Sequence, residues 1–330
     1  MRFVVFGAGA VGSVIGGRLA QHASSHGHDV SLVARPAHVA AIAASGLVIH
    51  DPVCATTIAV DAVERIDQVP LAAGDVVILT TKTQDTPAAL DQLARHAPAG
   101  IAVVCAQNGV ENERLALRLF DRVYGMCVLL PAAFMEPGVI DASGTPHNAI
   151  LDVGRYPSGT DSTSELVAGT LVASGLSSRS VPDVMRWKYG KLMLNLGNAA
   201  DALVSDRENI PTLTGPAKAE ADAVLAAAGI ARTSDEEDRE RRDGVMEVRP
   251  LHDASRHRGG GSTWQSLARG ATSTEVDWLN GEIVLLGRLH GVATPINELL
   301  CAAARRAVTL GLAPRSLTTA QLLANSSSAW

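Results

Sequence analysis

Aromatic residues are scarce in this chain, since Phe, Trp and Tyr make up only 3% of its 330 residues. A buried core must therefore be built from aliphatic side chains, which suits helices packed on a parallel sheet. Hydrophobic residues reach 47% against 19% charged residues, and this balance excludes a disordered or fibrous protein. At roughly 150 residues per domain, the length predicts about two domains.

Cysteine is also rare, and its four positions are widely separated: Cys54, Cys105, Cys127 and Cys301. No C-x-x-C pair occurs, so neither a disulfide framework nor a structural zinc site is expected. His22, His26 and His28 lie close together, but no carboxylate or cysteine joins them at ligand spacing. The sequence therefore predicts no metal site, and its cysteine usage is typical of a reduced, intracellular protein.

Basic residues are not in excess, because 28 Lys and Arg stand against 34 Asp and Glu, a formal net charge of −6. A nucleic-acid-binding protein normally carries a basic face, so no nucleic-acid partner is expected. No apolar run reaches the ~18 residues that a membrane span needs, and the first run is too short for a signal peptide. These absences predict a cytoplasmic protein with no membrane partner.

Short apolar runs alternate with helix-like segments through the first half of the chain. Strands are expected over residues 2–6, 29–34, 75–80 and 101–106, helices over 10–21, 36–44 and 86–95, and a hairpin over 47–50 and 56–60. A continuous apolar run is typical of a strand that is buried on both faces of a parallel sheet. The alternation predicts an α/β fold with an open, Rossmann-type parallel sheet and right-handed crossovers.

The second half contains long Ala- and Leu-rich segments with helical periodicity. Helices are expected over residues 184–203, 216–228, 273–290 and 296–310. A densely charged stretch, residues 232–261, interrupts the pattern and is interpreted as a solvated helix followed by a loop. The boundary between a parallel-sheet domain and an all-α domain is expected near Val181-Pro182.

A glycine motif joins the first expected strand to the first expected helix. Gly7-Ala8-Gly9-Ala10-Val11-Gly12 matches G-x-G-x-x-G, the fingerprint of dinucleotide-binding sites. Gly7 permits the tight turn, Gly9 leaves room for a pyrophosphate, and Gly12 lets the helix pack closely on the strand. The free N–H groups of the helix N-terminus favour phosphate. An ordinary Gly-rich turn is the alternative.

The end of the second strand indicates which cofactor the motif binds. An NAD site normally has Asp or Glu there, to hold the ribose 2′-hydroxyl. This chain has Leu32-Val33-Ala34-Arg35 instead, and Asp29 lies at the opposite end of the strand. Arg35 can pair with a 2′-phosphate, so NADPH/NADP is the expected cofactor. The alternative is a surface arginine in a loop.

Polar residues follow two further strands. Lys82 comes after the strand at residues 75–80, and Gln107-Asn108-Gly109 comes after the strand at residues 101–106. Ligands of open α/β sheets bind beyond the carboxyl ends of the strands. We therefore expect Lys82 to face phosphate or a substrate carboxylate, and Asn108 to bridge the nicotinamide ribose and the substrate. Ordinary Asn-Gly turn chemistry is the alternative.

One Leu-rich helix of the second half carries polar residues at regular intervals. Lys191, Asn195 and Asn198 recur at i, i+4 and i+7, so they share one stripe of a regular helix. Such side chains need hydrogen-bond partners, because burying a polar or charged group without one costs free energy. A cleft that faces the nucleotide would supply them. The alternative is a lysine that extends to the surface beside hydrogen-bonded asparagines.

Together these residues resemble the ketopantoate reductase (2-dehydropantoate 2-reductase) family over nearly the whole chain. The resemblance includes residues 262–265 and the run Thr274-Glu275-Val276-Asp277-Trp278-Leu279-Asn280-Gly281, close to the family's T-E-I-D-Y-I-N-G. It implies an NADP-binding Rossmann-type domain, residues 1–181, and a helical substrate and catalytic domain, residues 182–330. The implied reaction is the NADPH-dependent reduction of ketopantoate to pantoate.

The resemblance also implies roles for single residues. Lys191 matches the catalytic lysine that protonates the carbonyl oxygen, and Glu275 matches the glutamate near that lysine and the cofactor. Lys82 matches a lysine near the cofactor. Three positions match substrate-binding residues, the first of which also touches the cofactor: Asn108, Asn195 and Ser262.

The chain departs from the family pattern on the lysine-bearing helix. A second substrate asparagine commonly follows the lysine by eight residues, and that position is Ala199 here. Asn198, one residue earlier, could substitute for it in substrate binding on a regular helix. Lys188, one turn before Lys191, could compete for the catalytic role.

Three functions stay open from the sequence alone. The first is a reductase of the ketopantoate type. The second is a related oxidoreductase for another oxo or hydroxy acid, of the opine or 3-hydroxy acid type, and the third is a non-catalytic NADP(H) sensor. The expected partner is a small-molecule 2-oxo acid, and a homodimer is left open.

Overall fold

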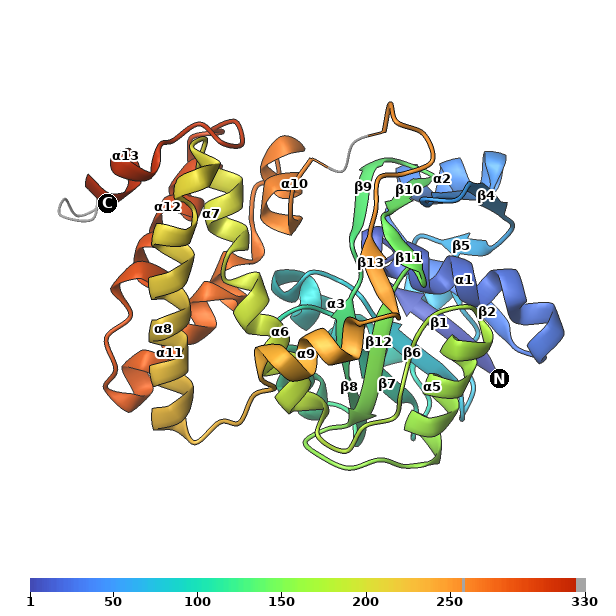
Figure 1. Cartoon of the computed structure of the whole chain (residues 1–330). Coiled ribbons are helices and arrows are strands. Elements are labelled where there is room, and N and C mark those ends of the chain that lie inside the picture. Colours follow the sequence, from blue (N-terminus) through green and yellow to red (C-terminus); the bar gives the residue numbers. More distant parts are fainter. Residues whose placement is uncertain (257–258, 325–330) are drawn as a thin grey trace. The chain divides into compact units, whose positions relative to one another are not determined.

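The computed structural model of the chain describes residues 1–256 and 259–324 (Figure 1). These residues form two compact units. The first unit comprises residues 1–188 and 233–256, and the second comprises residues 189–232 and 259–324.

A seven-stranded sheet forms the centre of the first unit, in the order β12-β8-β7-β6-β1-β2-β5. Its strands are β1 (Arg2–Phe6), β2 (Asp29–Val33), β5 (Asp61–Val63), β6 (Val76–Leu79), β7 (Ala102–Cys105), β8 (Arg122–Leu129) and β12 (Ile150–Arg155). Neighbouring strands pair in parallel, except that β12 runs antiparallel to β8. The order reverses at β1, because β2 pairs on one side of it and β6 on the other. The expected Rossmann-type parallel sheet is confirmed.

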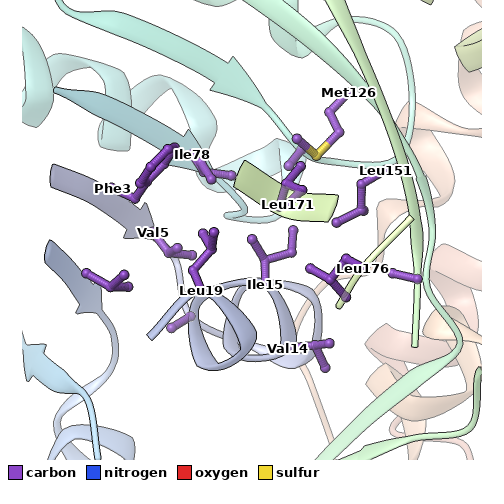
Figure 2. Packing of buried hydrophobic residues seen from close by; sticks show 14 of the residues in the cluster. Phe3, Val5, Val14, Ile15, Leu19, Ile78, Met126, Leu151, Leu171 and Leu176 are labelled. Carbon is purple, nitrogen blue, oxygen red and sulfur yellow. The ribbon is translucent and has the colours of Figure 1, made fainter. Parts of the chain in front are cut away.

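Helix α1 (Ala10–His26) packs on one face of this sheet (Figure 2). Its residues Ile15 and Leu19 are fully buried and belong to the same cluster as Phe3 and Val5 of β1. Leu171 of helix α5 (Ser162–Ala173) joins them. Burying an aliphatic side chain of this size contributes roughly 1.5–3 kcal/mol, so aliphatic residues build a core in which aromatics are few.

The opposite face of the sheet is buried as well. Val4 and Phe6, the alternate residues of β1, belong to a second cluster that includes Leu90 and Leu93 of helix α3 (Thr86–His96). Successive side chains of a strand point to opposite faces. Burial on both faces therefore explains why β1 is apolar from residue 3 to residue 6 and why β6 is apolar throughout.

Further elements of the first unit surround the main sheet. Helices α2 (Pro36–Ser45) and α4 (Asn112–Leu117) follow β2 and β7. A four-stranded sheet has the order β4-β3-β10-β9, formed by β3 (Leu47–His50), β4 (Ala55–Ile58), β9 (Ala132–Glu136) and β10 (Val139–Ala142). Strands β3 and β4 pair antiparallel, so the expected hairpin is confirmed.

The second unit is built from helices, as expected for the second half of the chain. They are the end of α6 (Val184–Asn195), α7 (Asn198–Leu203), α8 (Pro211–Ala228), α10 (Ser262–Ala268), α11 (Asn280–His290), α12 (Pro295–Thr309) and α13 (Thr319–Ala324). Their core is aliphatic and includes Leu203, Leu213 and Leu300. Within the described ranges, no helix is both long and apolar enough to cross a membrane.

The helix expected over residues 184–203 is two helices in the structure. Helix α6 ends at Asn195 and α7 begins at Asn198, with Leu196 and Gly197 in a turn between them. The apolar periodicity continues through this turn, since Leu196 is fully buried. Hydrophobic spacing alone therefore does not reveal the break, although a glycine inside a helical pattern is a weak signal for one.

The charged stretch over residues 232–261 is not simply a solvated helix and a loop. Helix α9 (Asp235–Arg242) and strand β13 (Met246–Val248) return to the first unit, where β13 pairs antiparallel with β11 (Gly144–Pro146). Arg241 of α9 is only 8% exposed and donates two hydrogen bonds of 2.7 Å to the Asp152 carboxylate. This ion pair and the β11–β13 pairing place most of the stretch in the first unit.

The two compact units consequently differ from the expected division at residues 181 and 182. The first unit continues to Lys188, inside helix α6, and it regains residues 233–256 later in the chain. The difference has a local cause, because Lys188 makes a buried ion pair with Glu113 of α4 within the first unit.

Candidate active site

Three loops at one edge of the main sheet carry the residues expected to bind a cofactor. They follow β1, β6 and β7, which are neighbours in the sheet and run parallel. The carboxyl ends of parallel strands meet at the same edge, and ligands of such sheets bind where the strand order reverses. In this unit the order reverses between β1 and β6, directly at the glycine motif.

Two glycines of the motif are required by the fold itself. Gly7 has a φ of +103°, and a Cβ there would lie 2.6 Å from the Thr81 backbone nitrogen. A Cβ on Gly12 would lie 2.4 Å from the Thr80 Oγ1 atom. The φ of Gly7 agrees with the predicted tight turn, and Gly12 lets α1 pack closely on β1, as predicted; both also leave room for Thr80 and Thr81 after β6.

Gly9 differs, because the protein leaves open the space above it. The nearest atom that a Cβ on Gly9 would meet is the Gly7 carbonyl oxygen, at 3.9 Å. Gly9 is also the N-cap of α1, where no side chain caps the helix and the first turn has no acidic residue. The N-terminus of this 17-residue helix, which has no side-chain cap, thus has room beside Gly9, and this arrangement fits a phosphate group.

Arg35 lies directly after the carboxyl end of β2 and is exposed. It is the N-cap of α2, and its guanidinium lies over the ring of Phe134, 5.6 Å from the centroid. No acidic residue occupies the end of β2. A positive charge is therefore present just beyond the carboxyl end of β2.

His38 joins three segments behind Arg35. Its Nδ1 atom accepts a 2.8 Å hydrogen bond from the backbone N–H of Gly138, so in the neutral ring Nε2 carries the proton and donates to Ser13 of α1 at 3.0 Å. Burial, with the charge of Arg35 adding to it, lowers the pKa of His38 from 6.5 to about 4. The imidazole is thus a neutral structural link between α1, α2 and the β9–β10 turn.

Lys82 and Asn108 lie in the loops after β6 and β7, where the sequence predicts them. Lys82 is the half-buried N-cap of the 3-10 helix η2 (Thr83–Asp85). Asn108 is half-buried, and its backbone oxygen accepts a 3.3 Å hydrogen bond from the side chain of Asn112. Both loops belong to the edge where the glycine motif lies.

The last turn of α6, in the second unit, carries Lys191 and Asn195. The Lys191 Nζ atom donates a 3.0 Å hydrogen bond to Asn195 Oδ1. Asn195 is 4% exposed, whereas Lys191 is half-buried. An ammonium group has three N–H donors, and this bond to a nearly buried amide fixes the direction of one of them.

Asn198 and Ser262 are brought together from positions 64 residues apart. Asn198 begins α7, Ser262 begins α10, and the Asn198 Nδ2 atom donates to Ser262 Oγ at 3.4 Å. Ala199 is 1% exposed and belongs to the aliphatic core, so this position does not present a side chain to a ligand. Asn198 does not share a continuous helix with Lys191, because the turn at residues 196–197 separates them.

Two further sequence candidates have different surroundings. Glu275 is the half-buried first residue of the 3-10 helix η4 (Glu275–Trp278), just before α11. Lys188 is 3% exposed, and its ammonium pairs with Glu113 and donates to the Gln107 carbonyl oxygen. Lys188 is therefore buried, and its ammonium is engaged within the first unit.

Sequence reasoning missed the residues that hold the start of α10. Asp201 of α7 accepts hydrogen bonds from the backbone N–H of Gly261, at 3.3 Å, and from Arg315, at 3.1 Å. The Arg315 guanidinium also lies over the ring of Trp264, 5.7 Å from its centroid. These partners are 60 to 114 residues from Asp201, so no local pattern signals them.

Other catalytic chemistries have little support in the structure. Burial raises the pKa of the Cys105 thiol well above its usual range and that of Cys301 to about 12, so neither is an activated nucleophile. Across residues 1–256 and 259–324, no group of three or more His, Cys, Asp or Glu side chains is placed to hold a metal ion.

Two family models match the chain in order. The model described as ketopantoate reductase PanE/ApbA matches residues 3–157, and its C-terminal counterpart matches residues 183–308. The chain belongs to the ketopantoate reductase family. The expected family membership is thereby confirmed. The prediction that the protein is an oxidoreductase is confirmed with it.

Two relatives illustrate this membership in the ketopantoate reductase family. The 2-dehydropantoate 2-reductase of Pyrococcus horikoshii is 28% identical over 325 residues, covering 94% of this chain and 99% of that protein. The 2-dehydropantoate 2-reductase of Halobacterium salinarum is 29% identical over 307 residues, covering 91% of this chain and 96% of that protein. The similarity thus extends through both halves of the chain.

Solved structures show the same fold. A PanE/ApbA family ketopantoate reductase from Ralstonia eutropha has a TM-score of 0.77 and 29% identity, covering 94% of this chain and 99% of its own. D-mandelate dehydrogenase with NADH and anilino(oxo)acetate has a TM-score of 0.78 at 20% identity, with the same coverage. At that identity the dehydrogenase shares the fold alone.

We predict that His38 makes the stability of the protein depend on pH. Between pH 6.5 and about 4 the unfolded chain takes up a proton on this residue that the folded protein does not. The free energy of unfolding should therefore decrease as the pH falls through this range, by up to ~1.4 kcal/mol per pH unit from this group. Urea unfolding at pH 7.5 and pH 5 measures the loss.

The variant His38→Gln removes the titrating ring, so its loss of stability between the two pH values should be smaller than that of the wild type. His290→Gln, at an exposed position on α11, is the matched control and should keep the full loss. An equal loss in His38→Gln and the wild type would contradict the assignment of a neutral, buried His38.

Proposed function

We propose that this protein catalyses the reduction of 2-dehydropantoate to pantoate by NADPH. The observation that carries the proposal is the match to the ketopantoate reductase family over both halves of the chain. The open position at Gly9, with Arg35 beyond β2, supports it independently, because this geometry fits a dinucleotide that has a 2′-phosphate. The choice of 2-dehydropantoate as the substrate rests on the relatives that are named 2-dehydropantoate 2-reductase.

The cofactor would be held by the first unit, and when bound it supplies the hydride. The N-terminus of α1 at Gly9 would hold the pyrophosphate, and Arg35 the 2′-phosphate. Lys82 adds a positive charge near the phosphates, and Asn108 would hydrogen-bond to the nicotinamide ribose. These residues all come from loops at the carboxyl edge of the sheet.

Lys191 would act on the carbonyl oxygen of the substrate. Reduction places a hydride on C2 and leaves negative charge on that oxygen. The Lys191 ammonium stabilises this charge and donates the proton that completes the hydroxyl group. Asn195 holds the ammonium in place through their 3.0 Å hydrogen bond, and Glu275 would favour its charged form.

The remaining polar residues of the second unit would bind the substrate. Ser262 lies at the N-terminus of α10, where its oxygen accepts a hydrogen bond from Asn198, and its hydroxyl hydrogen would be donated to the substrate. Both side chains offer hydrogen bonds to a carboxylate or hydroxyl group. Asn198 takes the role that an asparagine at position 199 has in the family pattern, from the start of α7 rather than from α6.

A related activity on another 2-oxo acid is the second candidate. D-mandelate dehydrogenase, whose structure holds anilino(oxo)acetate, has the same fold and coverage. The exposed Arg35 in place of an acidic residue distinguishes this chain from the pattern expected for NAD sites.

A panel of 2-oxo acids with NADPH tests the proposed function. We expect the loss of absorbance of NADPH to be fastest with 2-dehydropantoate, with pantoate as the product by mass spectrometry. A higher kcat/KM on a branched or aromatic 2-oxo acid would favour the second candidate. Tight binding of NADPH without turnover of any acid would indicate a sensor and overturn the proposal.

Replacing the proposed proton donor should remove turnover and leave cofactor binding intact. Lys191→Ala is expected to lower kcat by about 10²- to 10⁴-fold, the usual contribution of a positioned general acid. The dissociation constant of NADPH should change little. Lys218→Ala on α8 is the control, since that lysine has no part in the proposed site. Normal turnover in Lys191→Ala would exclude the assignment.

The choice between cofactors should depend on Arg35. Arg35→Ser removes a charge-assisted contact, which is worth about 1.5–3 kcal/mol, so the dissociation constant of NADPH should rise about 10- to 100-fold. NADH binding should change by less than about threefold, because NADH has no 2′-phosphate. Arg95→Ser, at an exposed position on α3, serves as the control. Equal effects on both cofactors would argue against a contact with the 2′-phosphate.

A further inference from the structure

A cluster of buried polar side chains lies beneath the loops that carry Lys82 and Asn108. Its members are all 5% exposed or less and belong to the first unit: Thr83, Thr86, Gln107, Asn112, Glu113 and Lys188. Burying polar groups costs free energy unless they are hydrogen-bonded, so the presence of six together requires a structural or functional explanation. We call these six residues the loop-base cluster.

Hydrogen bonds within the loop-base cluster join the two loops to each other. Thr86 accepts from Gln107 Nε2 at 3.0 Å and donates to Asn112 Oδ1 at 2.8 Å. Asn112 in turn donates to Thr83 Oγ1 at 3.1 Å and to the backbone oxygen of Asn108 at 3.3 Å. The loop after β6 and the loop after β7 are therefore held as one piece.

Lys188 adds a charge to this cluster. Its ammonium pairs with the Glu113 carboxylate and donates a 3.1 Å hydrogen bond to the Gln107 carbonyl oxygen, the backbone atom just before Asn108. The side chains of Lys188 and Glu113 are 2% and 0% exposed. Burial raises the pKa of the Glu113 carboxyl, and the ammonium of Lys188 opposes this shift.

Stability alone does not account for this ion pair. The desolvation of two charges offsets much of their attraction, and well-packed apolar replacements are often equally stable. In addition, Gln107 Oε1 and Glu113 Oε2 are buried atoms that accept no hydrogen bond from the described residues. What the pair does hold is one backbone atom, the Gln107 carbonyl oxygen, to which the Lys188 ammonium donates.

We infer that Lys188 and Glu113 are positioning residues that hold the Gln107 carbonyl and so direct the Asn108 side chain toward the nicotinamide ribose and the substrate. This inference rests on the proposed function for the role of Asn108. Neither Lys188 nor Glu113 touches substrate in this scheme, because both are buried beneath the loop. Their effect on the reaction passes through the Gln107–Asn108 backbone.

The decisive variant removes both charges together. Lys188→Met alone leaves a buried carboxylate without its counter-charge and should destabilise the protein strongly. The double variant Lys188→Met/Glu113→Gln has no buried charge, so its unfolding midpoint in urea should lie near that of the wild type. Lys218→Met on α8 controls for the loss of one lysine.

The double variant should separate binding from turnover. Its dissociation constant for NADPH should stay within about threefold of the wild type, because the phosphate-binding residues are unchanged. Its kcat with 2-dehydropantoate should fall about 10- to 100-fold, since a misplacement of about 1 Å in a positioning group has effects of this size. Lys218→Met should retain the wild-type kcat.

Two outcomes would overturn the inference. One is a folded double variant whose kcat stays within about twofold of the wild type, since the pair would then be structural only. The other is a double variant in which kcat and NADPH affinity fall together with the unfolding midpoint, which would report general damage.

Measuring the fluorescence emission of bound NADPH distinguishes a failure of this inference from a failure of the proposed function. The reduced nicotinamide ring fluoresces, and its emission responds to its immediate surroundings. We expect the double variant to change the emission of bound NADPH, whereas Lys218→Met does not. If the wild type reduces no 2-oxo acid, the proposed function fails, but this readout still applies. Unchanged emission in the double variant would then overturn the positioning role.

Discussion

The close approach of β6 to the turn after β1 constrains the rest of the first unit. The Thr80 backbone N–H donates to the Phe6 oxygen at 2.8 Å, and the Thr80 side chain donates to the Gly7 oxygen at 3.0 Å. This contact is compatible only with glycine at positions 7 and 12, where any Cβ would overlap Thr80 or Thr81. The same contact puts the N-terminus of α1 at the reversal of strand order. The packing requirement and the proposed phosphate site therefore share one cause.

Buried charges in this unit determine which distant segments pack together. Asp152 on β12 receives two hydrogen bonds from Arg241, and Glu113 pairs with Lys188 on α6. Pairs this deeply buried contribute little net stability, but leaving one partner alone costs several kcal/mol. Each pair therefore penalises any arrangement in which α9 or α6 fails to reach its place on the unit.

The sequence was sufficient to predict the main sheet and the loops at its carboxyl edge, because their signals are local. Burial on both faces makes continuous apolar runs, so β1 was predicted at residues 2–6, as observed. The positions of Lys82 and Asn108 followed from strand ends alone. The packing of α9 could not be predicted, because an arginine that pairs with a carboxylate 89 residues away has the same local pattern as a solvated one. The break at residues 196–197 was hidden by an apolar period that continues through it.

In the second unit, Arg315 has a strained backbone conformation, and its side chain holds other segments in place. Its φ of 58° lies in the left-handed region, which costs a residue with a side chain of order 1 kcal/mol or more. The strain is offset by bonds that this conformation permits: the guanidinium reaches Asp201 at 3.1 Å and the Gly259 oxygen at 3.2 Å, and it covers Trp264. These contacts hold the start of α10, where Ser262 lies. A strained backbone persists where the surrounding contacts over-determine it, and here those contacts fix a residue of the proposed substrate site.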